Sequence, residues 1–235
     1  MIWRNKEIRS ISVQKKKFLI SIVTYPILYS FKRCPYAMRA RMALRLAEIK
    51  CEIREVRLSN KPDHMLEVSP KGTVPILILE DKVIDESIDI VNWVIRMSSI
   101  FRNNLNSDQM NLTESLIKEF DDKFKHHLDR YKYATRYKDT DSDFHKAECL
   151  KILIHLETIA SEDKWIFGRK LSKLDISILP FIRQFRIANP EWFDSLSQIN
   201  KIKKILNNYL DSEDFKKIML NYDEWKLGSE PIYFP

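Results

Sequence analysis

Glycine is scarce in this sequence, with only three in 235 residues. The phosphate loops of P-loop and Rossmann proteins need closely spaced glycines, because the backbone there must approach a phosphate group closely. The sequence therefore excludes nucleotide chemistry of these two kinds. Cysteine is equally scarce: Cys34, Cys51 and Cys149 are too few and too scattered for a disulfide framework or a paired-cysteine zinc site. An odd number leaves at least one thiol free and favours a reducing compartment, so we expect a cytoplasmic protein.

The chain carries an excess of positive charge, with 40 Lys and Arg against 33 Asp and Glu. Most of it lies in residues 1–60, which hold fourteen basic and four acidic residues. A nucleic-acid-binding protein would combine such charge with base-stacking aromatics or a known docking motif, and the sequence offers neither. We therefore expect a solvated basic face and no nucleic-acid partner.

The amino terminus resembles a targeting signal at first sight, because seventeen polar and basic residues precede the apolar run FLISIVTYPILYS. No small-residue cleavage pattern follows, however, and the second half of the run has the pattern of a core strand. The run is also shorter than the roughly 20 apolar residues that a membrane span needs. The sequence therefore predicts an extension over residues 1–25 and no membrane partner.

Residues 26–98 alternate between strand and helix patterns. The sequence predicts strands at 26–31, 52–58, 74–79 and 82–84, and helices at 35–47, 62–67 and 86–97. The order β-α-β-α-β-β-α can form a four-stranded mixed sheet with helices on its faces.

Beyond this segment only helix patterns follow. Residues 99–108 are polar and predict a linker, and residues 109–235 predict an all-α second domain. Its expected helices lie near 108–133, 142–161, 174–188, 197–210 and 212–220. The aromatic tail at 222–235 is expected to pack back on the body of the protein.

Cys34 is the strongest candidate for chemistry. It follows the first predicted strand and precedes Pro35, which favours the first turn of a helix. The partial positive charge of a helix amino terminus lowers the pKa of a thiol toward the range of about 3.5 to 7.5 that reactive cysteines show. Four basic residues lie close to it in the sequence, Lys32, Arg33, Arg39 and Arg41. We therefore expect a thiolate nucleophile at neutral pH, the alternative being an inert buried cysteine.

The segment Cys34-Pro35-Tyr36-Ala37 resembles the glutaredoxin active-site motif, with Ala37 in place of the second cysteine. The layout around it is similar to the glutathione transferase superfamily, and in detail to a cysteine-type, omega-like bacterial member. The resemblance covers about residues 26–220, and its further motifs are Leu58–Pro62, Ser69–Pro75, Asp85–Ile88 and Ser172–Asp175. It implies a thioredoxin-like α/β domain followed by an all-α domain, glutathione as cosubstrate, and a homodimer.

Five residues are candidates for binding glutathione. A cis peptide between Val74 and Pro75 would turn the Val74 backbone toward the ligand as an added strand requires. Glu86 and Ser87 at a helix start can meet the ammonium and carboxylate of the γ-glutamyl group. Lys61 can reach the glycyl carboxylate. Taken singly, each could instead be a cap, a strand start or a solvated charge.

The predicted activity is that of an omega-like glutathione S-transferase of the thiol transferase or dehydroascorbate reductase type. Cys34 would form a mixed disulfide with glutathione, which a second glutathione would release. One alternative is a conjugating transferase that activates glutathione through a hydroxyl of Tyr29, Ser30 or Tyr36. Another is a non-catalytic interaction protein on the same fold.

Tyr36 and Tyr131 are candidates for the acceptor pocket, together with Tyr133 and Tyr137, although an aromatic stripe at helical spacing is more often core. The adjacent His126 and His127 lack both the i, i+4 spacing and the partner ligands of a zinc site, so no metal is predicted.

Overall fold

The computed structural model describes residues 25–102, 104–138 and 140–235, so nearly all of the predicted extension at 1–25 lies outside the described residues. The predicted strand and helix order of the first domain is confirmed. Its elements are β1 (Ile27–Ser30), α1 (Pro35–Leu46), β2 (Cys51–Glu55), α2 (Asp63–Val68), β3 (Ile76–Ile78), β4 (Val83–Ile84) and α3 (Ser87–Met97).

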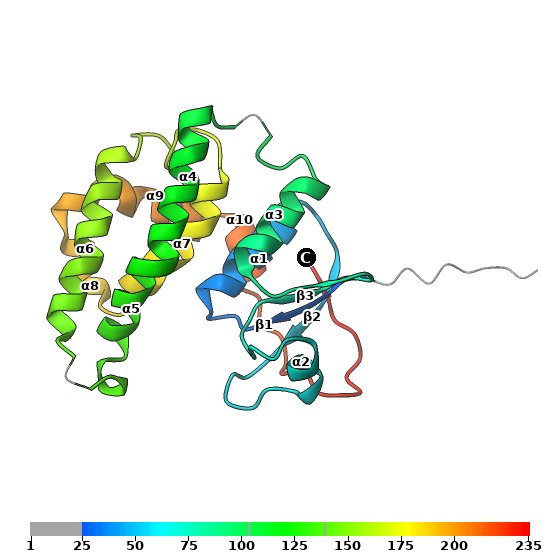
Figure 1. Cartoon of the computed structure of the whole chain (residues 1–235). Helices are drawn as coiled ribbons and strands as arrows, with labels where there is room; N and C mark the ends of the chain where they lie inside the picture. The colour runs from blue at the N-terminus through cyan, green and yellow to red at the C-terminus, as the bar shows by residue number, and fades with distance from the viewer. Residues whose placement is uncertain (1–24, 103, 139) are drawn as a thin grey trace, which may run out of the picture.

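The sheet has five strands in the order β4-β3-β1-β2-β5, with β1 parallel to β2 and antiparallel to β3. Helices α1 and α3 cover one face, and α2 lies on the other, as in a thioredoxin-like domain (Figure 1). The fifth strand, β5 (Tyr233–Phe234), pairs antiparallel with β2. The tail therefore packs back on the first domain, as expected. The sequence did not predict this strand, because it pairs with a segment far away in the chain and no local pattern marks it.

The second domain is helical, as predicted. It contains α4 (Ser107–Glu119), a π-helical turn (Phe120–Phe124), α5 (Lys125–Lys132), α6 (Ser142–Ile159), α7 (Lys173–Arg186), α8 (Pro190–Ser195), α9 (Asn200–Asp211) and α10 (Glu213–Ile218). Short 3₁₀ turns lie at Ala134–Arg136 and Ser197–Ile199. Within the described residues, no helix is long and apolar enough to cross a membrane.

Helix α7 forms the centre of the second domain, because eleven of its fourteen residues are buried. Ser172 begins the helix with a capping box, in which its side chain accepts from the Asp175 N–H and Asp175 accepts from the Ser172 N–H. Asp175 also accepts a hydrogen bond of 2.9 Å from the Ile166 N–H. The structural role expected for this motif is confirmed.

Arg39 of α1 ties the two domains together although its side chain is fully buried. It makes two hydrogen bonds, of 2.8 and 3.1 Å, to the carboxylate of Asp121 in the π-helical turn. It also donates to the Ser177 carbonyl of α7 and to the Ser87 hydroxyl at the start of α3. The first turn of α3 is thereby fixed against the helical domain.

Candidate active site

Cys34 lies between β1 and α1 and caps the amino terminus of α1, with Pro35 in the first turn. Its N–H donates to the Phe31 carbonyl at 2.9 Å, which fixes the turn that leads from the strand into the helix. The half-buried thiol donates to the Val74 carbonyl oxygen at 3.7 Å. The Val74–Pro75 peptide is cis, as expected. The structure therefore brings the candidate nucleophile and the candidate strand-pairing segment side by side.

The predicted low pKa of Cys34 is wrong. Burial raises the pKa of the thiol above its ordinary value, because the charged form loses its hydration. Hydrogen bonds from the backbone of Ala37 and Tyr36, together with the charges of Lys125 and Arg39, act in the opposite direction. They are outweighed by desolvation.

Two of the four basic residues near Cys34 in the sequence, Arg39 and Arg41, bind other partners rather than the thiol. The Arg39 guanidinium is used by Asp121, and Arg41 makes an ion pair with Glu55 while donating to the Ser30 hydroxyl. Lys125, from the helical domain, is the cation that acts most on the thiol. Helix spacing within α1 could not reveal it, since Lys125 is remote in sequence.

The hydroxyl groups that could activate glutathione differ in position. Tyr29 is fully buried and bonds to His64 and Arg54. The buried Ser30 hydroxyl accepts from Arg41. Tyr36 lines the cleft beside Cys34, but burial and the charge of Asp121 raise its pKa far above the ordinary value. None of these three hydroxyls is therefore both accessible and acidic.

The other candidate glutathione-binding residues lie around the start of α3. Glu86 is the residue before the helix, and Ser87 is its first residue and is buried. The ammonium of Lys61 lies next to the backbone of Gly72, whose positive φ of 59° and close neighbours leave little room for a side chain. The five candidates thus come from the segment after β2, from the start of β3 and from the start of α3.

Lys71 was missed by sequence reasoning, although it stands inside the motif at 69–75. Its ammonium contacts Glu86 at 2.7 Å and Asp85 at 3.2 Å, and Asp85 also accepts from the Ser69 hydroxyl at 2.7 Å. These bonds lower the pKa of Asp85. Lys71 therefore already pairs with the carboxylate expected to receive the ligand's ammonium.

A cleft of about 1370 Å³ opens beside Cys34 between the two domains. Tyr36, Tyr133 and Tyr137 line it, but Tyr131 does not and packs instead on Phe185 with ring centres 5.6 Å apart. For Tyr131 the core alternative therefore describes the structure better than the predicted pocket role.

The walls of this cleft are strongly basic. Its charged lining residues are seven cations, Lys32, Arg33, Arg57, Lys125, Lys132, Arg136 and Arg183, and three acids, Glu55, Asp129 and Glu224. Each acid bonds to a cation, namely Arg41, Lys125 and Arg57 respectively. The neighbouring charges of Arg183, Lys125 and Arg33 add to burial in lowering the pKa of Lys132. These cations are visible in the sequence. Local patterns do not reveal that four of them, from the helical domain, lie opposite the loop before α1.

Comparison with known proteins agrees with this geometry. Residues 28–98 match the family model described as glutathione S-transferase, N-terminal domain. The chain is 29% identical over 165 residues to the probable glutathione S-transferase parA of Nicotiana tabacum, covering 68% of this chain and 72% of that protein. It is 27% identical over 197 residues to glutathione S-transferase U19 of Arabidopsis thaliana, covering 81% and 88%.

Solved structures share the two-domain fold. A Tau class glutathione S-transferase from mango superposes with a TM-score of 0.72 at 21% identity, over 84% of this chain and 93% of that one. Glutathione transferase Omega 3C from Trametes versicolor gives 0.70 at 19% identity, over 85% and 90%. A family member from Pseudomonas fluorescens, solved with two glutathione bound, gives 0.72 at 16% identity, over 86% and 96%. Residues 28–98 therefore form a glutathione S-transferase N-terminal domain, and the chain as a whole has the two-domain fold of glutathione transferases.

Proposed function

We propose that the protein is a glutathione-dependent thiol transferase of the omega-like, cysteine type, with Cys34 as its nucleophile. The observation that carries the proposal is the position of the Cys34 thiol, at the amino terminus of α1 beside the basic cleft and the Val74 backbone. The neighbouring motif position is Ala37, so the first domain offers no resolving cysteine there.

The proposed reaction has two exchange steps. The half-buried Cys34 thiol first loses its proton to solvent, because only the thiolate is nucleophilic. The thiolate attacks the glutathione sulfur of a mixed disulfide, a Cys34–glutathione disulfide forms, and the acceptor leaves as a thiolate that takes up a proton. The thiolate of a second glutathione then attacks the glutathione sulfur on Cys34. Oxidised glutathione leaves, and the Cys34 thiolate is restored. Overall, one mixed disulfide and one free glutathione become one acceptor thiol and one oxidised glutathione, so the disulfide bond is exchanged and no other reductant is needed.

For glutathione itself we propose the site formed by Lys61, Val74, Pro75, Glu86 and Ser87. The start of α3 offers unpaired N–H groups to the γ-glutamyl carboxylate, and the start of β3 offers a backbone for pairing. Binding would require Lys71 to share or release Glu86, because the two side chains already form an ion pair of 2.7 Å.

The basic cleft favours an acceptor that carries negative charge. Five of its cations, Lys32, Arg33, Lys132, Arg136 and Arg183, make no ion pair with an acid in the part of the chain that the structure describes. Tyr36, Tyr133 and Tyr137 add aromatic surface. We propose an anionic acceptor with an apolar part, a class that includes mixed disulfides of acidic thiols. Free thiols and glutathione chemistry suit a reducing cytoplasm.

The test is a pair of assays on the wild type and on Cys34→Ser. The variant should no longer reduce the mixed disulfide that forms when glutathione reacts with hydroxyethyl disulfide, because serine cannot form the disulfide intermediate. Cys51→Ser, at a fully buried cysteine, is the matched control and should keep the activity if it folds. A wild type that conjugates an aromatic halide briskly, lacks thiol transfer and loses little with Cys34→Ser would favour the hydroxyl mechanism instead.

A further inference from the structure

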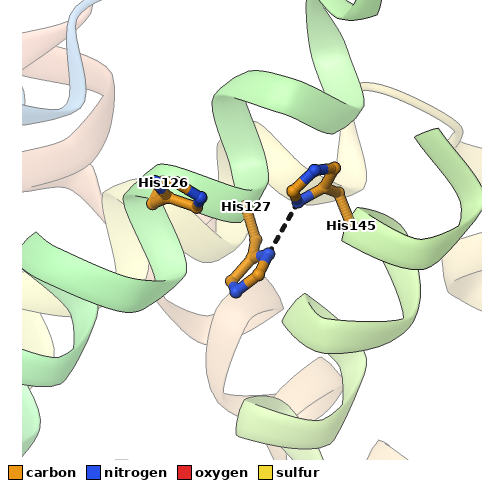
Figure 2. Close-up of side chains that lie close together, drawn as sticks. All are labelled: His126, His127 and His145. Carbon is orange, nitrogen blue, oxygen red and sulfur yellow. Dashed lines mark hydrogen bonds between the residues drawn. The ribbon is translucent and has the colours of Figure 1, made fainter. Parts of the chain in front are cut away.

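Three histidines meet on the outer side of the helical domain. His126 and His127 lie at the start of α5, and His145 lies in the first turns of α6, which runs beside α5. Figure 2 shows the three rings converging from the two helices. One nitrogen from each ring lies within 4.8 Å of the others. The partner ligand that the adjacent pair lacks in sequence is thus supplied by a second helix.

The spacing of the rings is close to that of a metal site. The Nδ1 atoms of His127 and His145 are 2.7 Å apart and share a hydrogen bond (Figure 2). Tetrahedral bonds of about 2.0 to 2.1 Å place ligand nitrogens about 3.4 Å apart, so this pair needs to open by well under 1 Å. His126 is exposed, and its ring can turn toward the pair without displacing the core.

The surroundings of the cluster are mixed in charge. Glu148 and Asp141 supply negative charge toward His145, and Glu148 also acts on His127. Arg130 opposes a cation, since its guanidinium donates to His126 Nδ1 at 3.0 Å. That guanidinium also stacks 4.5 Å above the Tyr137 ring, which gives it a place to remain when it releases the histidine.

We propose that His126, His127 and His145 bind one divalent transition-metal ion of the zinc type, with water in the remaining position. Three imidazoles suit Zn²⁺, Ni²⁺ and Cu²⁺ rather than Mg²⁺ or Ca²⁺, which prefer oxygen ligands. Binding requires the proton shared between the two Nδ1 atoms to move to another ring nitrogen or to solvent. None of the three histidines lines the cleft, although Leu128, Asp129 and Lys132 of the same helix do. A bound ion would therefore fasten α5, one wall of the cleft, to α6.

The test is calorimetric titration of the tag-free, metal-stripped full chain with Zn²⁺ alone. We expect one ion per chain and a higher unfolding temperature with the ion, since a ligand that binds only the folded state stabilises it. His145→Ala and His127→Ala should each weaken binding by about tenfold or more, because loss of even an indirect contact to a ligand costs about that much. His155→Ala is the matched control, as His155 is an exposed histidine on the same helix α6.

Cys34→Ser distinguishes the histidine cluster from a thiol site. Binding that survives Cys34→Ser and His155→Ala but is lost in His145→Ala and His127→Ala supports the proposal. Binding lost only with Cys34→Ser, binding unchanged in both cluster variants, or no binding by the wild type would overturn it. Thermal unfolding of each variant without metal shows whether the variant is folded. His126→Ala changes an exposed side chain, so this variant should fold like the wild type.

Discussion

At the residue scale, Cys34 shows two opposing influences on one thiol. Its place at a helix amino terminus favours the thiolate, whereas burial under the domain interface disfavours it, and burial has the larger effect. The charge of Lys125 partly compensates. The pKa of the Cys34 thiol therefore depends on a residue of the helical domain.

The pH profile of alkylation checks this balance. Iodoacetamide reacts with thiolates, so the raised pKa predicts that the rate at Cys34 keeps rising above pH 9, the ordinary value for this group. Lys125→Ala should slow the reaction at a fixed pH, and Lys125→Arg should not. Cys51 and Cys149 are fully buried and should stay unmodified in the folded protein. A rate that levels off below pH 7.5 would contradict the burial argument.

Arg39 is the residue whose loss should harm stability most clearly. Arg39→Met leaves the Asp121 carboxylate and the Ser177 carbonyl without their partner, and breaking a buried pair from one side costs about 3 to 5 kcal/mol. Arg45→Ala is the control on the same helix, because its pair with Asp214 is partly exposed and should contribute under about 1 kcal/mol. Urea unfolding of both variants measures the difference, and equal losses would show that Arg39 is not the special link.

At the element scale, α7 carries a buried acid in its first turn. Burial raises the pKa of Asp175 from 3.8 to about 6, although hydrogen bonds from Ile166 and Ser172 to its carboxylate act the other way. The folded state then holds an extra proton between about pH 4 and 6 relative to the unfolded chain. This contribution to stability is present below pH 4 and is lost as the pH rises through about 6, a change of about 3 kcal/mol.

Comparing the wild type with Asp175→Asn tests this pH dependence, since asparagine does not titrate. Between pH 4 and 7, the unfolding free energy of the wild type should fall relative to that of Asp175→Asn. A difference that stays constant across this range would show that Asp175 titrates normally in the folded state.

The elements that the sequence revealed were those with strong local signals. The proline after Cys34, the alternation at residues 52–58 and the capping box at Ser172 each depend on neighbouring residues. The helix start and the capping box are confirmed, and the strand is confirmed at Cys51–Glu55, ending three residues earlier than predicted. Helix α8 was missed because six residues are too few to show a helical period. The pairing of Arg39 with Asp121, the approach of Lys125 to Cys34 and the meeting of His145 with His127 join distant segments, which no local pattern encodes.

At the scale of the whole molecule, the basic cleft between the domains should decide which acceptors bind. Lys132→Ala and Arg183→Ala should each raise KM for an anionic mixed disulfide by about fivefold, the equivalent of about 1 kcal/mol, and change KM for a neutral one little. Added salt should have the same selective effect. Lys204→Ala, at an exposed lysine outside the cleft, is the control. Equal changes in KM for the anionic and the neutral acceptor would show that the charge of the cleft does not determine which acceptor binds.

The division into units at 26–98 and 109–235, joined by 99–108, remains a proposal, except that the strand at residues 233–234 belongs to the sheet of the first unit. The homodimer that family resemblance implies is also a proposal. Light scattering at micromolar concentration should give twice the mass of one chain. A mass of one chain would contradict the dimer while leaving the site at Cys34 unaffected.

The pairing of β5 with β2 has a consequence for how the protein is made. The strand that closes this edge of the first domain's sheet lies at residues 233–234, after the entire helical domain. During synthesis, the first domain leaves the ribosome with that edge unpaired, and the edge stays unpaired until the whole second domain has been translated. Until then the N–H and C=O groups on the outer edge of β2 are open to other chains, because only the inner edge pairs with β1. A chaperone or a second nascent chain can pair there in place of the protein's own last residues.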